Sequence, residues 1–153
     1  MFFKKISIRF AAAGTAFMLF LSACGADPAL TQFKSEMDAF CSSIYDINDS
    51  INQIDASSEN ASDLALAYLD QLDDKFKEFA DMDFPEAYDY LEPLADEAAS
   101  YMQTAVESYH LVYAENGYDE EKADYARENS VRAFKRVQVI LQVLHGEEPA
   151  QAE

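Results

Sequence analysis

Residues 28–54, PALTQFKSEMDAFCSSIYDINDSINQI, decide the fold class of this chain. Apolar side chains recur here at alternating steps of three and four residues: Leu30, Phe33, Met37, Phe40, Ile44, Ile47, Ile51 and Ile54. That spacing puts them on one face of a helix and leaves the polar residues between them on the other. The stretch therefore predicts an amphipathic helix at about 29–54, and its seven-residue repeat favours near-parallel packing against other helices.

Three further helices are predicted at about 61–80, 86–116 and 119–145. Turn formers at 55–60 precede the first of them, and Pro85 opens the second. Pro93 lies inside the helix predicted at 86–116, so it either kinks that helix or restarts it and leaves 86–91 as a separate turn. We expect Asn116 and Gly117 to end this helix, and Gly146 to end the last one, which starts with acid at 119–121.

These four segments predict an all-α fold, an antiparallel up-down four-helix bundle over residues 29–146, about 40 Å long at ~1.5 Å per residue. A three-helix fold with the second helix frayed is the alternative. Many positions on the apolar faces of the last two helices, the core stripes, are Ala or Ser. These small residues either permit close packing or leave a groove. Residues 147–153 form an acidic tail with nothing to bury.

The N-terminal segment has the pattern of an export signal. Lys4, Lys5 and Arg9 precede an apolar run from Ala11 to Ala23 that is too short to span a bilayer as a helix of roughly 20 residues. Residues 21–24, LSAC, resemble the lipobox of bacterial lipoproteins. The alternative interpretation of Cys24 is a buried thiol at the end of a core helix.

The resemblance implies that residues 1–23 are a lipoprotein signal peptide, cleaved between Ala23 and Cys24. Cys24 would then carry a thioether-linked diacylglycerol, and residues 24–28 would tether the bundle to the extracytoplasmic face of the cell membrane. Gly25 stands where an Asp would signal retention in the inner membrane, so a diderm source would favour the outer membrane. The mature chain resembles small helical bacterial lipoproteins in style, which implies no activity.

Charge limits the partners of the mature chain. The formal net charge is −18, and removal of the three basic residues of the signal segment lowers it to −21. Nucleic acid is an improbable partner, because phosphate binding depends on clustered Lys and Arg. Cys41 would be the one remaining thiol, either buried or available for an intermolecular bridge, so we expect no internal disulfide.

A cluster of tyrosines around the junction of the last two helices marks a candidate interaction surface, for which we select Tyr101, Tyr109, Tyr113 and Tyr125. Tyrosine combines a large apolar face with a hydroxyl that tolerates water, as in recognition surfaces, although boundary tyrosines of any bundle have the same pattern. Five basic residues of the last helix either pair with acids on neighbouring helices or mark a face for an anionic ligand or an acidic partner: Lys122, Arg127, Arg132, Lys135 and Arg136.

Two weaker patterns point to metal or haem. Glu107 and His110 have the E-x-x-H spacing of di-iron bundles, but the chain has no second such pair. Met37 and His145 would meet at one end of an antiparallel bundle, as in b-type cytochromes with a Met–His haem. A core methionine and a histidine at a helix C-terminus explain the same residues.

No pattern for nucleophilic catalysis or a calcium loop occurs in the chain. We therefore expect a non-enzymatic module, anchored by the lipid on Cys24 and without any other cofactor, that binds another envelope or extracellular protein. The alternative is a carrier of a small molecule, metal or haem inside the bundle; an enzyme ranks last.

Overall fold

The computed structural model describes residues 27–114 and 118–147. It contains four α-helices: α1 (Pro28–Asn52), α2 (Ala61–Ala80), α3 (Glu92–Val112) and α4 (Glu120–Leu144), with a 3-10 helix, η1 (Asp89–Leu91), in front of α3. No strand occurs in these two ranges. The predicted all-α four-helix class is confirmed, and α2 has the predicted bounds.

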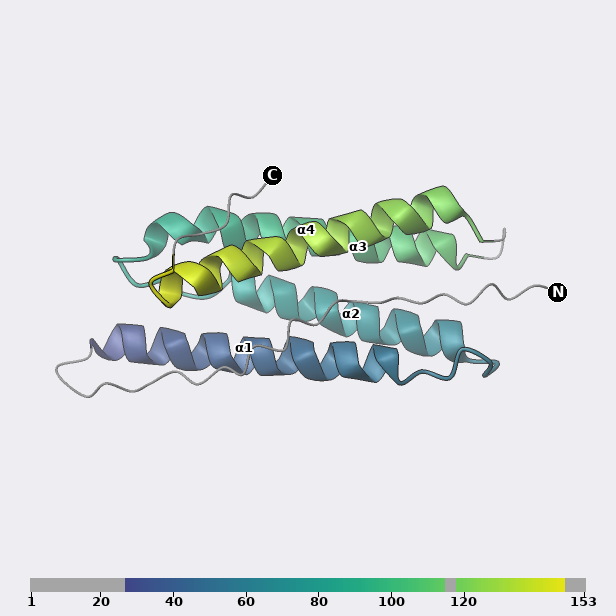
Figure 1. Cartoon of the computed structure of the whole chain (residues 1–153), viewed down its shortest axis with the longest axis horizontal. Coiled ribbons are helices and arrows are strands. Elements are labelled where there is room, and N and C mark those ends of the chain that lie inside the picture. The colour runs from purple at the N-terminus through teal and green to yellow at the C-terminus, as the bar shows by residue number, and fades with distance from the viewer. Residues whose placement is uncertain (1–26, 115–117, 148–153) are drawn as a thin grey trace.

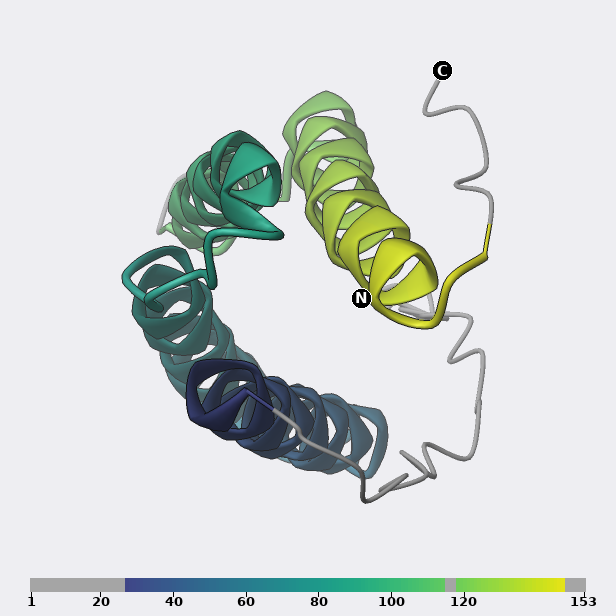
Figure 2. The same cartoon turned by 90° about the vertical axis from the view of Figure 1, so that its left-hand side faces the viewer.

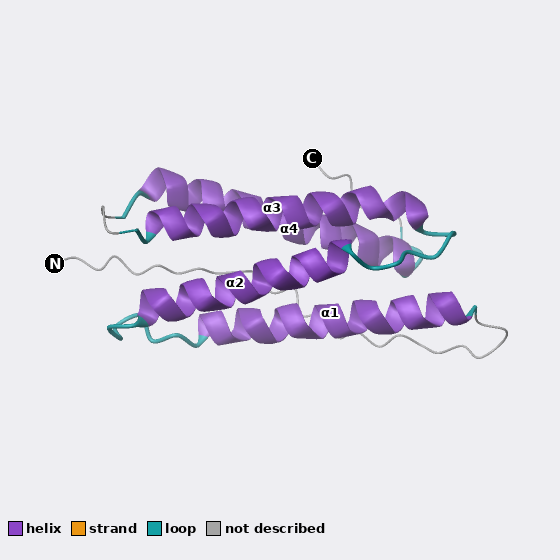
Figure 3. Ribbon diagram, turned by 180° about the vertical axis from the view of Figure 1, so that it is seen from behind, coloured by secondary structure: helices purple, strands orange, loops and turns teal. Residues whose placement is uncertain are grey.

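The helices run up, down, up and down along a rod (Figure 1). The start of α1, the connection from α2 to α3 and the end of α4 share one end of the rod, which we call the near end. The α1–α2 loop, the end of α3 and the start of α4 share the other, the far end, as Figure 3 shows from behind. The start of the first helix therefore lies at the same end as the end of the fourth, as expected for an antiparallel bundle.

The ring of helices is closed on only three of its four sides. Packing is most extensive between α3 and α4, followed by α2 with α3 and then α1 with α2, whereas the backbones of α1 and α4 hardly approach each other. Figure 2, along the axis, shows the four helices as an arc. The residues at the α3–α4 contact explain the asymmetry, because small side chains let two backbones come close: Ala95, Ala98, Ala105, Ala126, Ser130 and Ala133, all fully buried.

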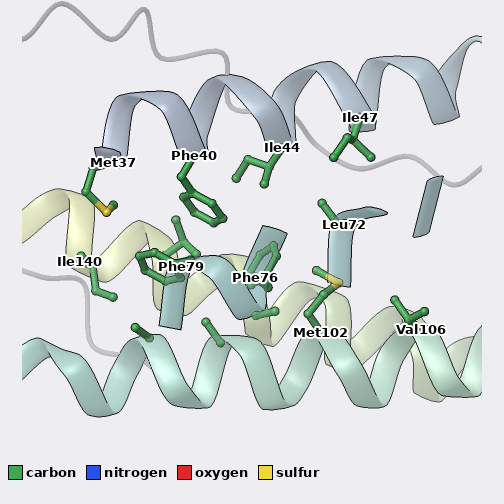
Figure 4. Close-up of a cluster of buried hydrophobic side chains, with 14 of the residues drawn as sticks. Met37, Phe40, Ile44, Ile47, Leu72, Phe76, Phe79, Met102, Val106 and Ile140 are labelled. Atoms are coloured by element: carbon green, nitrogen blue, oxygen red, sulfur yellow. The ribbon is translucent and has the colours of Figure 1, made fainter. Parts of the chain in front are cut away.

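The core is formed by the predicted stripes. Phe33, Phe40, Phe76, Phe79 and Phe84 pack together, and the rings of Phe40 and Phe79 stack with centroids 4.5 Å apart. Figure 4 shows the side chains of α1 pointing toward those of α2 and α3. Aromatic side chains bury large apolar areas, so this cluster fixes α1 on the rest of the bundle.

The third helix is shorter than predicted. Residues 86–91 are not part of it: they form a turn and η1, and α3 starts at Glu92 with Pro93 in its first turn, where the missing N–H of proline costs no helical hydrogen bond. Of the two alternatives for Pro93, the restart is therefore correct. The helix ends at Val112, the last residue of the core stripe, rather than at 116, and the predicted cap at 116–117 lies outside the described residues.

The other helix ends agree with the sequence to within two residues. α1 ends at Asn52, so Ile54 lies outside the helix. The Asp119 side chain caps α4 by accepting a hydrogen bond from the Lys122 N–H at 3.1 Å. Gly146, with φ +72°, follows the end of α4 in the left-handed conformation that glycine adopts without strain.

The predicted signal peptide, the cleavage site at Ala23 and Cys24, and most of the tether lie outside the described residues. Within the described ranges, no helix combines the length and the apolar character needed to cross a membrane.

Candidate interaction surface

A second stripe of residues, distinct from the core stripe, runs along one side of α3 and α4. On α3 it contains Glu97, Tyr101, Thr104, Ser108 and Leu111, and on α4 it contains Tyr125, Asn129, Arg132 and Arg136. Steps of three and four residues place each set on one side of its helix. We call these nine residues the outer α3–α4 face.

Direct contacts join the two halves of this face. The Arg136 Nε donates to the Glu97 Oε2 at 2.6 Å, and the guanidinium carbons of Arg136 and Arg132 lie 5.6 Å and 5.9 Å from the centre of the Tyr101 ring. A guanidinium group over an aromatic ring is attracted by the negative face of the ring. The two arginines therefore order Tyr101, whose side chain is half-buried.

These contacts fix the register of the two antiparallel helices. Because Glu97 pairs with Arg136, Tyr125 lies level with Ser108, and Leu111 lies one helical turn nearer the far end. Ser108 and Asn129 are buried between the helices and donate to carbonyl oxygens of their own helices. Leu111 and Tyr125 stay exposed, at 61% and 52%. The far half of the face is thus apolar and accessible.

Tyr109 is not part of any surface. It is only 5% exposed and belongs to the core cluster. Burial, and then the neighbouring Tyr113, raises the pKa of its hydroxyl to about 12, against the opposing effects of Arg127 and of a hydrogen bond with Ser130. Tyr109 lies on the core stripe of α3, so we remove it from the predicted interaction surface.

The remaining tyrosines divide between two sides of the bundle. Tyr101 and Tyr125 lie on the outer α3–α4 face, whereas Tyr113 is half-buried against the core and lies near Tyr118 at the far end. Burial, and then the proximity of Tyr118, raises the pKa of Tyr113. The four tyrosines selected from the sequence therefore do not form one surface. The sequence analysis did not select Leu111. Its position outside the core stripe of α3, unusual for a leucine, is the signal that could have identified it.

Most basic residues of α4 pair with acids, but three of these pairs form within α4 or its cap and not with neighbouring helices, which the first alternative predicted. Lys122, Arg127 and Arg132 pair with acids of the same helix or its cap, at 3.1, 2.9 and 3.8 Å. Arg136 alone among these pairs reaches another helix, through Glu97. Exposed pairs contribute little to stability, on the order of 0–1 kcal/mol, but the pairs of Arg132 with Glu128 and of Arg136 with Glu97 leave the outer face close to electrically neutral.

Glu107 and His110 do not converge on a site. Both side chains are exposed. The Glu107 carboxylate accepts a hydrogen bond from Gln103 at 2.9 Å, and the His110 Nε2 lies 2.6 Å from the Asp70 Oδ1. His110 therefore links α3 to α2 at the surface.

Met37 and His145 are at the same end of the bundle but in different surroundings. Met37 is buried in the core cluster and points into it from α1 (Figure 4), whereas His145 is exposed at the end of α4. Asp38 of α1 interacts electrostatically with His145: burial raises the pKa of the Asp38 carboxyl, and the charge of His145 opposes the rise. Partial burial, and then the Asp38 carboxylate, raises the pKa of the free Cys41 thiol to about 11.

No cluster of three or more His, Cys, Asp or Glu side chains that could hold a metal ion occurs in residues 27–114 and 118–147. One open pocket of about 460 Å³ lies at the near end, between the start of α1 and the turn that follows α2. Its lining combines two carboxylates with apolar and aromatic groups: Asp27, Leu30, Pro85, Glu86, Ala87 and Tyr88. None of the predicted metal or haem residues lines it.

No family model, curated protein or solved structure matches this chain.

Proposed function

We propose that the protein is a lipid-anchored, extracytoplasmic and non-enzymatic interaction module, which binds another protein through the outer α3–α4 face. Cleavage after Ala23 and a diacylglycerol on Cys24 would attach it to the cell membrane, or to the outer membrane in a diderm. Two acyl chains hold a protein stably at a membrane, since each buried methylene contributes about 0.8 kcal/mol.

The observation that carries the proposal is the exposure of Leu111 and Tyr125 on the same face as the ordered Tyr101. Large apolar side chains on a protein surface are common singly, but here two of them share a helical face with a tyrosine over which two guanidinium groups lie. Tyrosine and arginine are enriched in the energetic centres of protein interfaces. A side chain that is already ordered also loses less conformational entropy on binding.

The test is capture of the natively lipidated protein from its own membranes in mild detergent, with co-purifying proteins identified by mass spectrometry. A stoichiometric association should be present with the native chain, lost with Leu111→Ser/Tyr125→Ser and retained with Tyr45→Ser, a control that removes an equally exposed tyrosine from α1. Association that survives the double substitution would contradict the assignment of this face.

The same sample tests the carrier alternative. Stoichiometric metal, or a visible absorbance of haem, would favour a carrier over an interaction module. Circular dichroism of each variant verifies that the helical fold is unchanged.

A further inference from the structure

We infer that the partner of the outer α3–α4 face is a second copy of this chain, so that two anchored bundles pair side by side as a parallel two-fold dimer. This inference rests on the proposed function, because it names the occupant of the same face and uses the lipid anchor to set the orientation.

Charge favours this face over the others for self-association. Two mature copies, each with a formal charge of −21 after removal of Lys4, Lys5 and Arg9 from the −18 of the full chain, repel each other over most of their surfaces. α1 and α2 carry acids in excess along their exposed sides, whereas the outer face balances Glu97 and the neighbouring Glu128 against Arg132 and Arg136. Like charges that meet across an interface cost several kcal/mol, so a neutral face is where two copies can approach.

The signs of the charges are also arranged for a two-fold dimer. The α3 side of the face carries Glu97 and no base, and the α4 side carries both arginines. A two-fold axis parallel to the rod places α3 of one copy against α4 of the other, with every residue at the same height in both. Arg136 of one copy is then level with Glu97 of its partner, because these residues are level within one chain.

The apolar residues obey the same symmetry. Tyr125 is level with Ser108, one turn from Leu111, so the two-fold operation brings Tyr125 of each copy beside Leu111 of its partner. Two such contacts form in the far half of the interface, nearer the far end than Tyr101, Arg132 and Arg136 are. The face is therefore complementary to itself, as an isologous interface requires.

A lipid on Cys24 selects this orientation. Cys24 precedes Pro28, the first residue of α1, by four residues, which span at most ~14 Å of chain. The near end of each copy is thus held close to the membrane. Two copies in one membrane must then lie parallel, and anchoring in a plane raises their effective concentration.

The experiment uses the lipidated mature protein in mild detergent, with Cys41→Ala as background. Two separately tagged chains, one with Leu111→Cys and one with Tyr125→Cys, are mixed and treated with a short bis-maleimide. The mixture should give a cross-linked dimer in much higher yield than either chain alone. A Tyr45→Cys chain mixed with the Leu111→Cys chain is the control and should give none.

Sedimentation equilibrium supplies the second measurement. The native chain should have the mass of two copies, and Leu111→Ser or Tyr125→Ser should raise the dimer dissociation constant by at least about tenfold each, because each loses buried apolar area. Leu64→Ser, on α2, should leave the dissociation constant unchanged.

The outcomes separate this inference from the proposed function. A monomeric native chain that captures a different protein through the outer face overturns the second-copy inference and leaves the proposed function standing. A dimer that is insensitive to the Leu111 and Tyr125 substitutions, or that cross-links through Tyr45→Cys, overturns the inference as well. A chain that associates with nothing overturns both.

Discussion

Replacement of Phe79 by alanine tests the core that holds α1 on the bundle. Phe79 has 0% exposure, its ring stacks on Phe40 of α1, and its centroid lies 6.4 Å from that of Phe84 after α2. Removal of the ring leaves a cavity bordered by several elements, and such substitutions cost about 3–5 kcal/mol. A domain of this size has a free energy of unfolding of roughly 5–15 kcal/mol, so Phe79→Ala should remove a large fraction of it.

The assay is urea unfolding followed by far-ultraviolet circular dichroism. The urea concentration at the midpoint of unfolding should fall in Phe79→Ala. The slope of the free energy of unfolding against urea concentration should stay constant, since the same surface is exposed on unfolding. Tyr45→Ala is the control: Tyr45 is 59% exposed, and surface substitutions of this kind change stability by about 0.5 kcal/mol or less. A loss below about 1 kcal/mol for Phe79→Ala would contradict the described packing of α1 on α2.

A double-mutant cycle isolates the stacked pair. Phe40→Leu, made in the native chain and in Phe79→Leu, should show a coupling of about 0.5–1.5 kcal/mol, the usual contribution of an aromatic pair beyond its buried area. Additive effects of the two substitutions would mean that the rings do not contact.

Three further predictions concern buried groups of the bundle. Tyr109 has a folded-state pKa of about 12, above the ordinary tyrosine value of 10.0, so its protonated form stabilises the fold. This stabilisation should be complete below pH 10 and lost as the pH rises toward 12, and the free energy of unfolding should depend less on pH in this range in Tyr109→Phe. Cys41 has a pKa of about 11 rather than 9.0, so less of its thiol is ionised at pH 8 in the native protein than in urea. It should therefore react with a thiol reagent roughly 100-fold more slowly in the native protein. Equal rates would mean that the thiol is accessible in the native protein. Ala133→Leu should destabilise the bundle by about 1–3 kcal/mol, because Ala133 is fully buried where α3 and α4 pack closely; a stabilised variant would reveal a cavity instead.

The local pattern of the sequence was enough to predict the number of helices, their order and most of their ends. The apolar stripe of residues 28–54 identified the buried residues of α1, because alternating steps of three and four residues keep side chains on one face of a helix. Pro93 left two alternatives open, because a proline is compatible with either a kink or a first turn. The contacts of Leu91 and Phe84 with the core, which favour the restart, depend on tertiary structure.

The candidate surface was harder to predict than the fold. The cluster of tyrosines in the sequence suggested one surface, but Tyr109 lies on the core stripe and Tyr101 and Tyr125 lie on a second one. The pairing of Glu97 with Arg136, 39 residues apart, sets the register that brings the second stripes of α3 and α4 together, and a single sequence does not contain that register. The open side between α1 and α4 likewise follows from the close packing of α3 with α4.

The lipid anchor is the central claim of the proposed function, and one measurement tests it most directly. The mass of the N-terminal peptide, obtained by mass spectrometry from protein purified out of its own membranes, should correspond to a chain that begins at Cys24 and carries a diacylglycerol on that residue. An unmodified Cys24, or a chain that still contains residues 1–23, would contradict the anchor and with it the parallel arrangement of two copies.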